Sequence, residues 1–244
     1  VSKKGLSTDK VLSIYDDNRG LLWIGTKGGG LNVAPLDQAL QGKNAFVSYK
    51  HQTNNHHSLT NDDVFCMQQD SSGNLWIGTG GGLNKLDYSS NARETILDGE
   101  ARFEAYLERD GLPNNLIYGI LGDNQGNLWI STNQGLSKFD PEQEQFTNFG
   151  EKDGLQGDAF HYNAYEKLSN GYMLFGGTEG LTIFHPDSIH RKPIRSDVVM
   201  TSFKVMNERV DPGDKIHGRE ILDQDISHTR SLNLSHREKE VTFE

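Results

Sequence analysis

Short hydrophobic runs separated by glycine-rich turns recur along most of this chain. The plainest run is Leu-Trp-Ile-Gly-Thr at 75–79, and it follows an Asp-x-x-Gly turn that begins at Asp70. Related runs occupy 22–26 and 128–132, and a weaker copy at 171–178 is expected to place Phe175 at the position of the tryptophan. Repeats of this length, built from short strands and turns, are typical of propellers and solenoids.

Each repeat is predicted to hold four strands, which is the content of one propeller blade. The first strands are expected at Val11 to Tyr15, Val64 to Gln68, Ile117 to Leu121 and Phe160 to Tyr165. The third strands are expected at Leu31 to Ala34, Leu83 to Leu86, Leu136 to Phe139 and Leu181 to Phe184. The fourth follow a Phe-x-x-aromatic pattern at 46–49, 103–106 and 146–149. The fold class is therefore all-β.

The repeat pattern stops after Phe184, and this sets the expected domain boundaries. Four blades are predicted at about 1–50, 51–107, 108–150 and 151–186, followed by a linker at 187–195 and a second β domain at 196–244 that is cut short. Because a propeller removes its sheet edges by closing, four blades are expected to form an incomplete propeller, an arc that tends to pair with another copy.

The repeated tryptophans and aspartates suggest structural roles. Trp23, Trp76 and Trp129 are expected to lie buried between neighbouring sheets. The aspartate of each Asp-x-x-Gly turn can accept hydrogen bonds from the backbone, so no catalysis is assigned to it. The triple-glycine runs are not followed by Lys-Ser/Thr, so they are turns and not phosphate loops.

Charge and cysteine content exclude several classes of function. The net charge is −10, and residues 1–185 hold 14 Lys and Arg against 23 Asp and Glu, which leaves −9. An acidic surface disfavours nucleic-acid binding. Cys66 is the only cysteine, so neither an intramolecular disulfide nor a Cys-based zinc site is possible. No run of about 18 apolar residues exists, so the anchor of a membrane-bound parent protein would lie outside these residues.

The loop at 51–57, His-Gln-Thr-Asn-Asn-His-His, is the most unusual connection between blades. Its histidines could ligate a metal, but no carboxylate stands at a regular spacing, and a solvated loop is the alternative. We expect no metal, no cofactor and no catalytic residue. The loops between blades carry amide, charged and aromatic side chains suited to binding sugars. The candidate ligand-binding residues are His51, Asn54, Asn55, His56, Arg109, Asp110, Asn114, Asn115, Asp153, Gln156, His161 and Tyr162.

The Asp-x-x-Gly-x-Leu-Trp-Ile-Gly-Thr repeats resemble the two-component regulator propeller family, and 158–186 is similar to the last blade of that family. Residues 196–244 resemble the opening strands of its immunoglobulin-like triple-tyrosine domain. The resemblance implies a periplasmic sensor module of a membrane-anchored histidine kinase or related regulator, with no catalysis of its own. It further implies a small-molecule ligand, such as an oligosaccharide. A homodimer is expected separately, from the exposed edges of the arc. The alternative is a propeller glycoside hydrolase or lyase, which needs a close pair of carboxylates.

Overall fold

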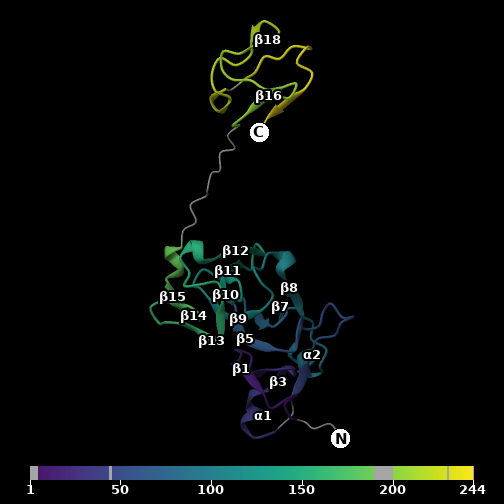
Figure 1. Cartoon of the computed structure of the whole chain (residues 1–244). Coiled ribbons are helices and arrows are strands. Elements are labelled where there is room, and N and C mark those ends of the chain that lie inside the picture. Colours follow the sequence, from purple (N-terminus) through teal and green to yellow (C-terminus); the bar gives the residue numbers. More distant parts are fainter. Residues whose placement is uncertain (1–4, 44–45, 190–199, 230, 244) are drawn as a thin grey trace. The chain divides into compact units, whose positions relative to one another are not determined.

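A computed structural model of the chain describes residues 5–43, 46–189, 200–229 and 231–243. The chain forms two compact units, residues 1–190 and residues 191–244, which are described separately below (Figure 1). Most of the linker predicted at 187–195 lies outside the described residues, as do the first four residues of the second domain predicted at 196–244.

The first unit is built from four antiparallel sheets, and each is one propeller blade. Blade 1 contains β1 (Val11–Asp16), β2 (Leu21–Thr26), β3 (Gly30–Pro35) and β4 (Val47–Tyr49). Blade 2 contains β5 (Val64–Gln69), β6 (Leu75–Thr79), β7 (Gly82–Leu86) and β8 (Glu104–Tyr106). Blade 3 contains β9 (Ile117–Gly122), β10 (Leu128–Thr132), β11 (Gly135–Asp140) and β12 (Gln145–Phe149). Blade 4 contains β13 (Phe160–Lys167), β14 (Met173–Gly177) and β15 (Gly180–Phe184). The predicted all-β propeller fold is confirmed.

Three apolar layers between successive blades form the core of this unit. Trp23 lies between blades 1 and 2, Trp76 between blades 2 and 3, and Trp129 between blades 3 and 4. Each indole is at most 1% exposed, which confirms the predicted burial. Each indole N–H donates to the aspartate six residues earlier, at 2.9, 2.8 and 3.1 Å respectively. Each layer between blades therefore contains a tryptophan–aspartate hydrogen bond within a mainly apolar contact.

The fourth blade departs from the predicted register. Phe175 does not occupy the tryptophan position, because Phe175 pairs with Tyr165 as Ile130 pairs with Ile120. Leu174 stands at the tryptophan position instead. The turn glycine, Gly171, and not the aromatic residue of the strand, sets the register of blade 4 relative to the other blades. Like Gly73 and Gly126 it has a positive φ, which glycine adopts without strain.

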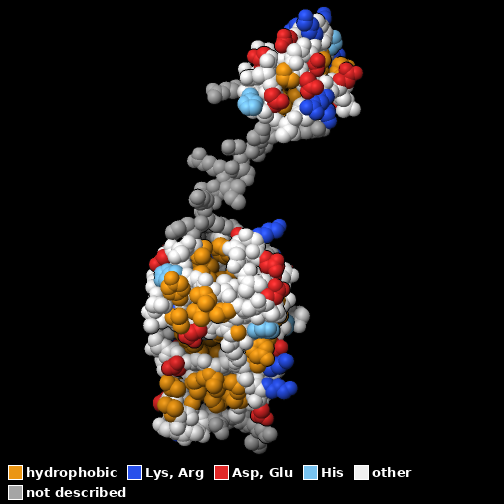
Figure 2. Space-filling view, turned by 60° about the vertical axis from the view of Figure 1, so that its left-hand side comes forward, with side chains coloured by type: hydrophobic (Ala, Val, Ile, Leu, Met, Phe, Trp, Pro, Cys, Tyr) orange, Lys and Arg blue, Asp and Glu red, His pale blue; other side chains and the backbone are white. Residues whose placement is uncertain are grey.

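The blades form an arc in which the inner strands contact one another in chain order, β1 to β5, β5 to β9 and β9 to β13. Both ends of the arc expose apolar side chains. Val11 and Ile14 are 41% and 68% exposed on blade 1, and Leu181 and Ile183 are 51% and 56% exposed on blade 4. Figure 2 shows two corresponding apolar areas on the propeller unit.

Connections within and between blades contain the short helices. The third-to-fourth connections of blades 1 and 2 hold α1 (Leu36–Leu40) and α2 (Arg93–Leu97). The connections into blades 3 and 4 hold the 3₁₀ turns η1 (Glu108–Asp110) and η2 (Glu151–Asp153), and η3 (Pro186–Ser188) follows blade 4. No helix among the described residues is long and apolar enough to cross a membrane.

The second unit is small. It pairs β16 (Phe203–Val205) with β17 (Glu208–Arg209) and with β20 (Val241–Phe243), beside a hairpin of β18 (Lys215–Ile216) and β19 (Arg219–Glu220). The turn η4 (Ile226–His228) adds Ile226 to a core around Phe203. These elements are β structure, and the immunoglobulin-like assignment stays a prediction.

Candidate functional site

The loop between blades 1 and 2, residues 50–63, is stabilised by hydrogen bonds among its own residues. The Ser58 hydroxyl accepts from the Gln52 backbone N–H at 2.9 Å and donates to the Asn55 carbonyl at 2.8 Å. The Asn55 side chain accepts from the backbone N–H of His57 at 3.0 Å and donates to the Gln52 side chain at 3.1 Å. These bonds hold the loop in one shape although most of its side chains are exposed.

Two further contacts fix the loop on blade 2. The Phe103 backbone N–H donates to the His57 carbonyl at 2.9 Å. Thr60 and Asn84 exchange two hydrogen bonds, at 3.0 and 2.8 Å. Because Asn84 is fully buried in the third strand of the blade, the loop is tied to a rigid part of the sheet.

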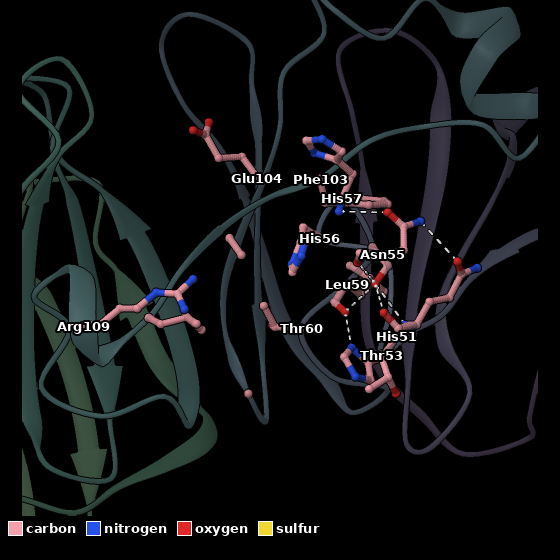
Figure 3. A pocket seen from close by; sticks show the side chains of 15 residues that line it. His51, Thr53, Asn55, His56, His57, Leu59, Thr60, Phe103, Glu104 and Arg109 are labelled. Carbon is pink, nitrogen blue, oxygen red and sulfur yellow. Dashed lines mark hydrogen bonds between the residues drawn. The ribbon is translucent and has the colours of Figure 1, made fainter.

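This loop, the start of β8 and the turn η1 enclose a cavity of about 460 Å³. A cavity of this size suits a small ligand. Arg109 reaches toward it from the side opposite His51, and His56 lies between them in the close view (Figure 3). The lining consists of His51, Gln52, Thr53, Asn55, His56, His57, Ser58, Leu59, Thr60, Gly81, Phe103, Glu104, Ala105, Leu107 and Arg109.

Four of the twelve predicted site residues therefore line one cavity, namely His51, Asn55, His56 and Arg109. Asn54 lies in the same loop, exposed and outside the lining. The sequence reasoning missed Glu104 and Phe103, which come from the fourth strand of blade 2. It also left His57 out of the site, although His57 belongs to the same run of histidines.

The predicted residues that follow Arg109 brace the loop between blades 2 and 3. The Asp110 carboxylate accepts from the Leu107 N–H at 2.9 Å, and Asn115 accepts from the Glu108 N–H at 2.8 Å. Asn114 accepts from the N–H of Leu116 at 3.0 Å. These side chains hold the turn from which Arg109 projects.

The predicted residues of the loop between blades 3 and 4 do not line this cavity. Asp153 accepts from the Gly150 N–H at 2.9 Å, as Asp110 does in the preceding loop, and the Gln156 side chain accepts from Glu179 at 2.9 Å. His161 and Tyr162 are exposed on β13, and the Tyr162 ring lies 5.9 Å from that of Phe65.

Other groups that could support chemistry are committed to the fold. A second cavity of about 250 Å³ is lined by carboxylates that include Asp70 and Asp123, but each of these accepts from a buried indole. Burial raises the pKa of the Cys66 thiol well above its ordinary value, so this thiol is protonated and unreactive. Among the described residues, no three His, Cys, Asp or Glu side chains gather as metal ligands.

The repeats match a known family of propellers. Residues 5–28, 58–81 and 111–134 each match the two component regulator propeller family. The repeats of this chain therefore resemble those of the two component regulator propeller family, as the sequence predicts. The three matches begin just before the first strands of blades 1 to 3 and end in the turns after their second strands, so the repeated motif of this propeller is the family motif.

Longer relatives of the propeller are regulators. The chain is 27% identical over 259 residues to Histidine kinase P4 of Formosa agariphila. That match covers 90% of this chain and 18% of that protein. It is similar to the extracellular domain assigned to the hybrid two component system BT3049 of B. thetaiotaomicron. That match has a TM-score of 0.66 and 25% identity, over 88% of this chain and 28% of that one.

The extracellular domain of BT4673 from the same organism shares the fold, with a TM-score of 0.60 at 23% identity over 76% of this chain and 24% of that one. This chain therefore spans about a quarter or less of the length of these three relatives. Because the BT3049 relative is an extracellular domain, the expected extracytoplasmic location is confirmed.

Proposed function

We propose that this propeller contributes to the binding of an extracytoplasmic signal, a carbohydrate or another small polar molecule, at the cavity between the first two inter-blade loops. The observation that supports the proposal most is that His51 and Arg109, from loops separated by a whole blade, line the same cavity. Imidazole, amide and guanidinium groups hydrogen-bond sugar hydroxyls.

The proposal includes no catalysis. A glycoside hydrolase requires two carboxyl groups facing one site at about 5–10 Å. Glu104 is the one carboxylate in the lining of this cavity. A binding function requires no such pair, and the BT3049 relative is the extracellular domain of a two component system. Incubating the full-length protein with chromogenic glycosides should release no chromophore, and turnover would favour the hydrolase alternative.

We propose further that the parent protein is membrane-anchored and homodimeric, and that the unit at residues 191–244 carries the signal away from the propeller. The kinase relative extends far beyond the matched region, which supports a larger regulator. Crosslinking the full-length protein with and without ligand would test the dimer.

Titration calorimetry on the full-length sensor with a panel of oligosaccharides tests the site. Arg109→Ala should weaken binding of any ligand that the wild type binds. Arg102→Ala is the matched control, because Arg102 is also exposed in blade 2 but lies outside the lining. Tyr162→Ala separates the cavity from the other predicted residues. Loss of binding in Tyr162→Ala with full binding in Arg109→Ala would move the site to β13.

A further inference from the structure

The cavity lining is unusual for this propeller because its ionisable groups are mainly basic. The lining contains Arg109 and the three histidines of the loop but one carboxylate, that of Glu104. Residues 1–185 as a whole carry a charge of −9 with histidine neutral, from 14 basic and 23 acidic residues. A concentration of basic side chains on an acidic domain requires an explanation from the site itself.

The single carboxylate of the lining is itself paired. The Lys85 ammonium on β7 lies 4.0 Å from the Glu104 carboxylate, which offsets its charge at this edge of the cavity. The Arg109 guanidinium lies 3.8 Å from the Asp110 carboxylate, but the Arg109 side chain is 76% exposed, so an ion pair there is weak. Arg109 is thus free to exchange this partner for a ligand.

The histidines differ in how far the fold commits them. His51 Nδ1 lies 2.7 Å from the Leu59 carbonyl oxygen, so Nδ1 carries the proton and Nε2 is left to contact a ligand. The His51 backbone N–H donates to Asp62 at 2.7 Å. Within the described residues, the His56 and His57 imidazoles take part in no hydrogen bond or ion pair, and the loop is braced without them.

These observations point to one ligand class. We infer that the cavity binds an anionic group, a carboxylate or a sulfate ester, on an oligosaccharide. This inference rests on the proposed function and specifies its ligand. A guanidinium matches the geometry of a carboxylate or sulfate, and charge-assisted hydrogen bonds are about twice as strong as neutral ones. The braced loop reduces the entropy lost on binding.

Histidine is the side chain whose charge ordinarily changes between pH 5 and 8, so binding of an anion should strengthen as pH falls. The charged and titratable groups that bear on this dependence are His51, His56 and His57 of the loop, Asp62, Lys85 on β7, Glu104 on β8, and Arg109 and Asp110 of η1. Protonation of a histidine adds positive charge to the cavity, which favours an anionic ligand.

The test begins with the full-length protein on a glycan array. The array carries oligosaccharides of polygalacturonate and alginate, of carrageenan and chondroitin sulfate, and of the neutral polymers laminarin and galactan. Binding should be confined to the acidic probes, and the uronate and sulfate probes identify which anion is recognised. Affinity for the best probe, measured by calorimetry, should be about tenfold or more higher at pH 6 than at pH 8.

Variants assign the effect to this cavity. Arg109→Gln should weaken binding about tenfold at both pH values, and Arg109→Lys should recover part of the loss. The double variant His56→Gln/His57→Gln should bind with little dependence on pH. His236→Gln, an exposed histidine of the second unit, is the control that leaves binding unchanged.

Each outcome decides a separate point. Binding confined to neutral probes would overturn the anionic ligand while the proposed sensing function stands. Binding of no probe would contradict both. Binding of acidic probes that Arg109→Gln and the double histidine variant leave unaltered would show that the anion binds elsewhere, and the inference about this cavity would be wrong.

Discussion

Blades 1 to 3 and blade 4 use the same backbone plan with different chemistry at its centre. In blade 2 the indole of Trp76 donates to Asp70, whereas blade 4 has Leu174 at the tryptophan position and Leu168 at the aspartate position. Both partners are replaced together, which leaves no buried polar group without a partner.

The comparison shows what the aspartate does. In blade 4 the Leu168 N–H donates to the Tyr172 carbonyl at 2.8 Å, the same backbone bond that Asp70 makes to Asn74 at 3.0 Å. Gly171 keeps a positive φ of 89°. The hairpin thus forms without the carboxylate, and the main role of the carboxylate is to satisfy an indole N–H inside the layer between blades.

The largest effect is expected from removing a buried indole. Trp76→Ala should lower the free energy of unfolding by about 3–5 kcal/mol, because it empties the layer between blades 2 and 3. The matched change, Leu174→Ala, should cost about 1–2 kcal/mol, since Leu174 is only partly buried. Urea denaturation measures both, and equal losses would show that blade 4 is packed like the others.

The second largest effect is expected at Asp17. Its carboxylate accepts from the backbone N–H of Leu21 at 2.8 Å, from the indole of Trp23 at 2.9 Å and from the hydroxyl of Tyr88. Asp17→Ala leaves several buried donors without an acceptor, and each such donor costs about 1–3 kcal/mol. The free energy of unfolding should therefore fall by more than about 2 kcal/mol. Leu168→Ala at the equivalent, 42% exposed position should cost less than about 1 kcal/mol. A larger loss at Leu168 would contradict the role assigned to the carboxylate.

The shared plan of blades 1 to 3 could be predicted from the sequence, because a tryptophan, a glycine turn and an aspartate recur at fixed spacing. The plan of blade 4 could not, because the replacement of both partners removes the marker that sets the register. The first strands of the other blades bulge by one residue, while β13 bulges by three between Phe160 and Tyr165, with Asn163 at a positive φ of 60°. No residue pattern signals that bulge.

The cavity was predictable only in part. The histidine run identified the first loop, and Arg109 was named from the second. Whether the two loops line one cavity depends on how far apart blade 2 holds them. No local sequence pattern encodes that distance. Glu104 could have been found from the rule that the outer strand of a blade lies beside the loop leading into the same blade.

Glycine substitution should give a smaller contrast between the same regions. A Cβ on Gly78 would lie 2.4 Å from the Cys66 sulfur and 2.6 Å from Ile117 Cγ2. Gly78→Ala should therefore cost about 1–3 kcal/mol through overpacking. At the equivalent Gly176 the nearest atom is Ala164 Cβ at 3.2 Å, so the same change should cost less than about 1 kcal/mol. Thermal unfolding of the two variants checks the difference, and a reversed order would refute it.

Alkaline pH should destabilise the blades that have a fourth strand. Burial raises the pKa of Tyr49, on β4, to about 12. The phenol in the unfolded chain loses its proton from about pH 10, so stability is full below pH 10 and falls by about 1–2 kcal/mol as pH approaches 12. Tyr49→Phe should flatten this fall. An unchanged pH profile in that variant would assign the alkaline transition to other groups.

The smallest effect is expected on the exposed face of blade 4. Ile183 occupies the position of Lys85 and Lys138, whose ammonium groups lie 5.6 and 5.9 Å from the ring centres of Trp76 and Trp129. Blade 4 has no such ring, and Ile183 is 56% exposed. Ile183→Lys in the 244-residue chain should therefore change the unfolding free energy by less than about 0.5 kcal/mol, because the lysine enters water and gains no cation–π contact.

Adding Leu174→Trp should restore that contact and give the double variant more stability than the two single changes predict, by about 0.5–1 kcal/mol. A double-mutant cycle by urea denaturation measures this coupling. Zero coupling would show that the lysine and the ring fail to meet on blade 4, and that its outer face differs from the other blades in geometry as well as in composition.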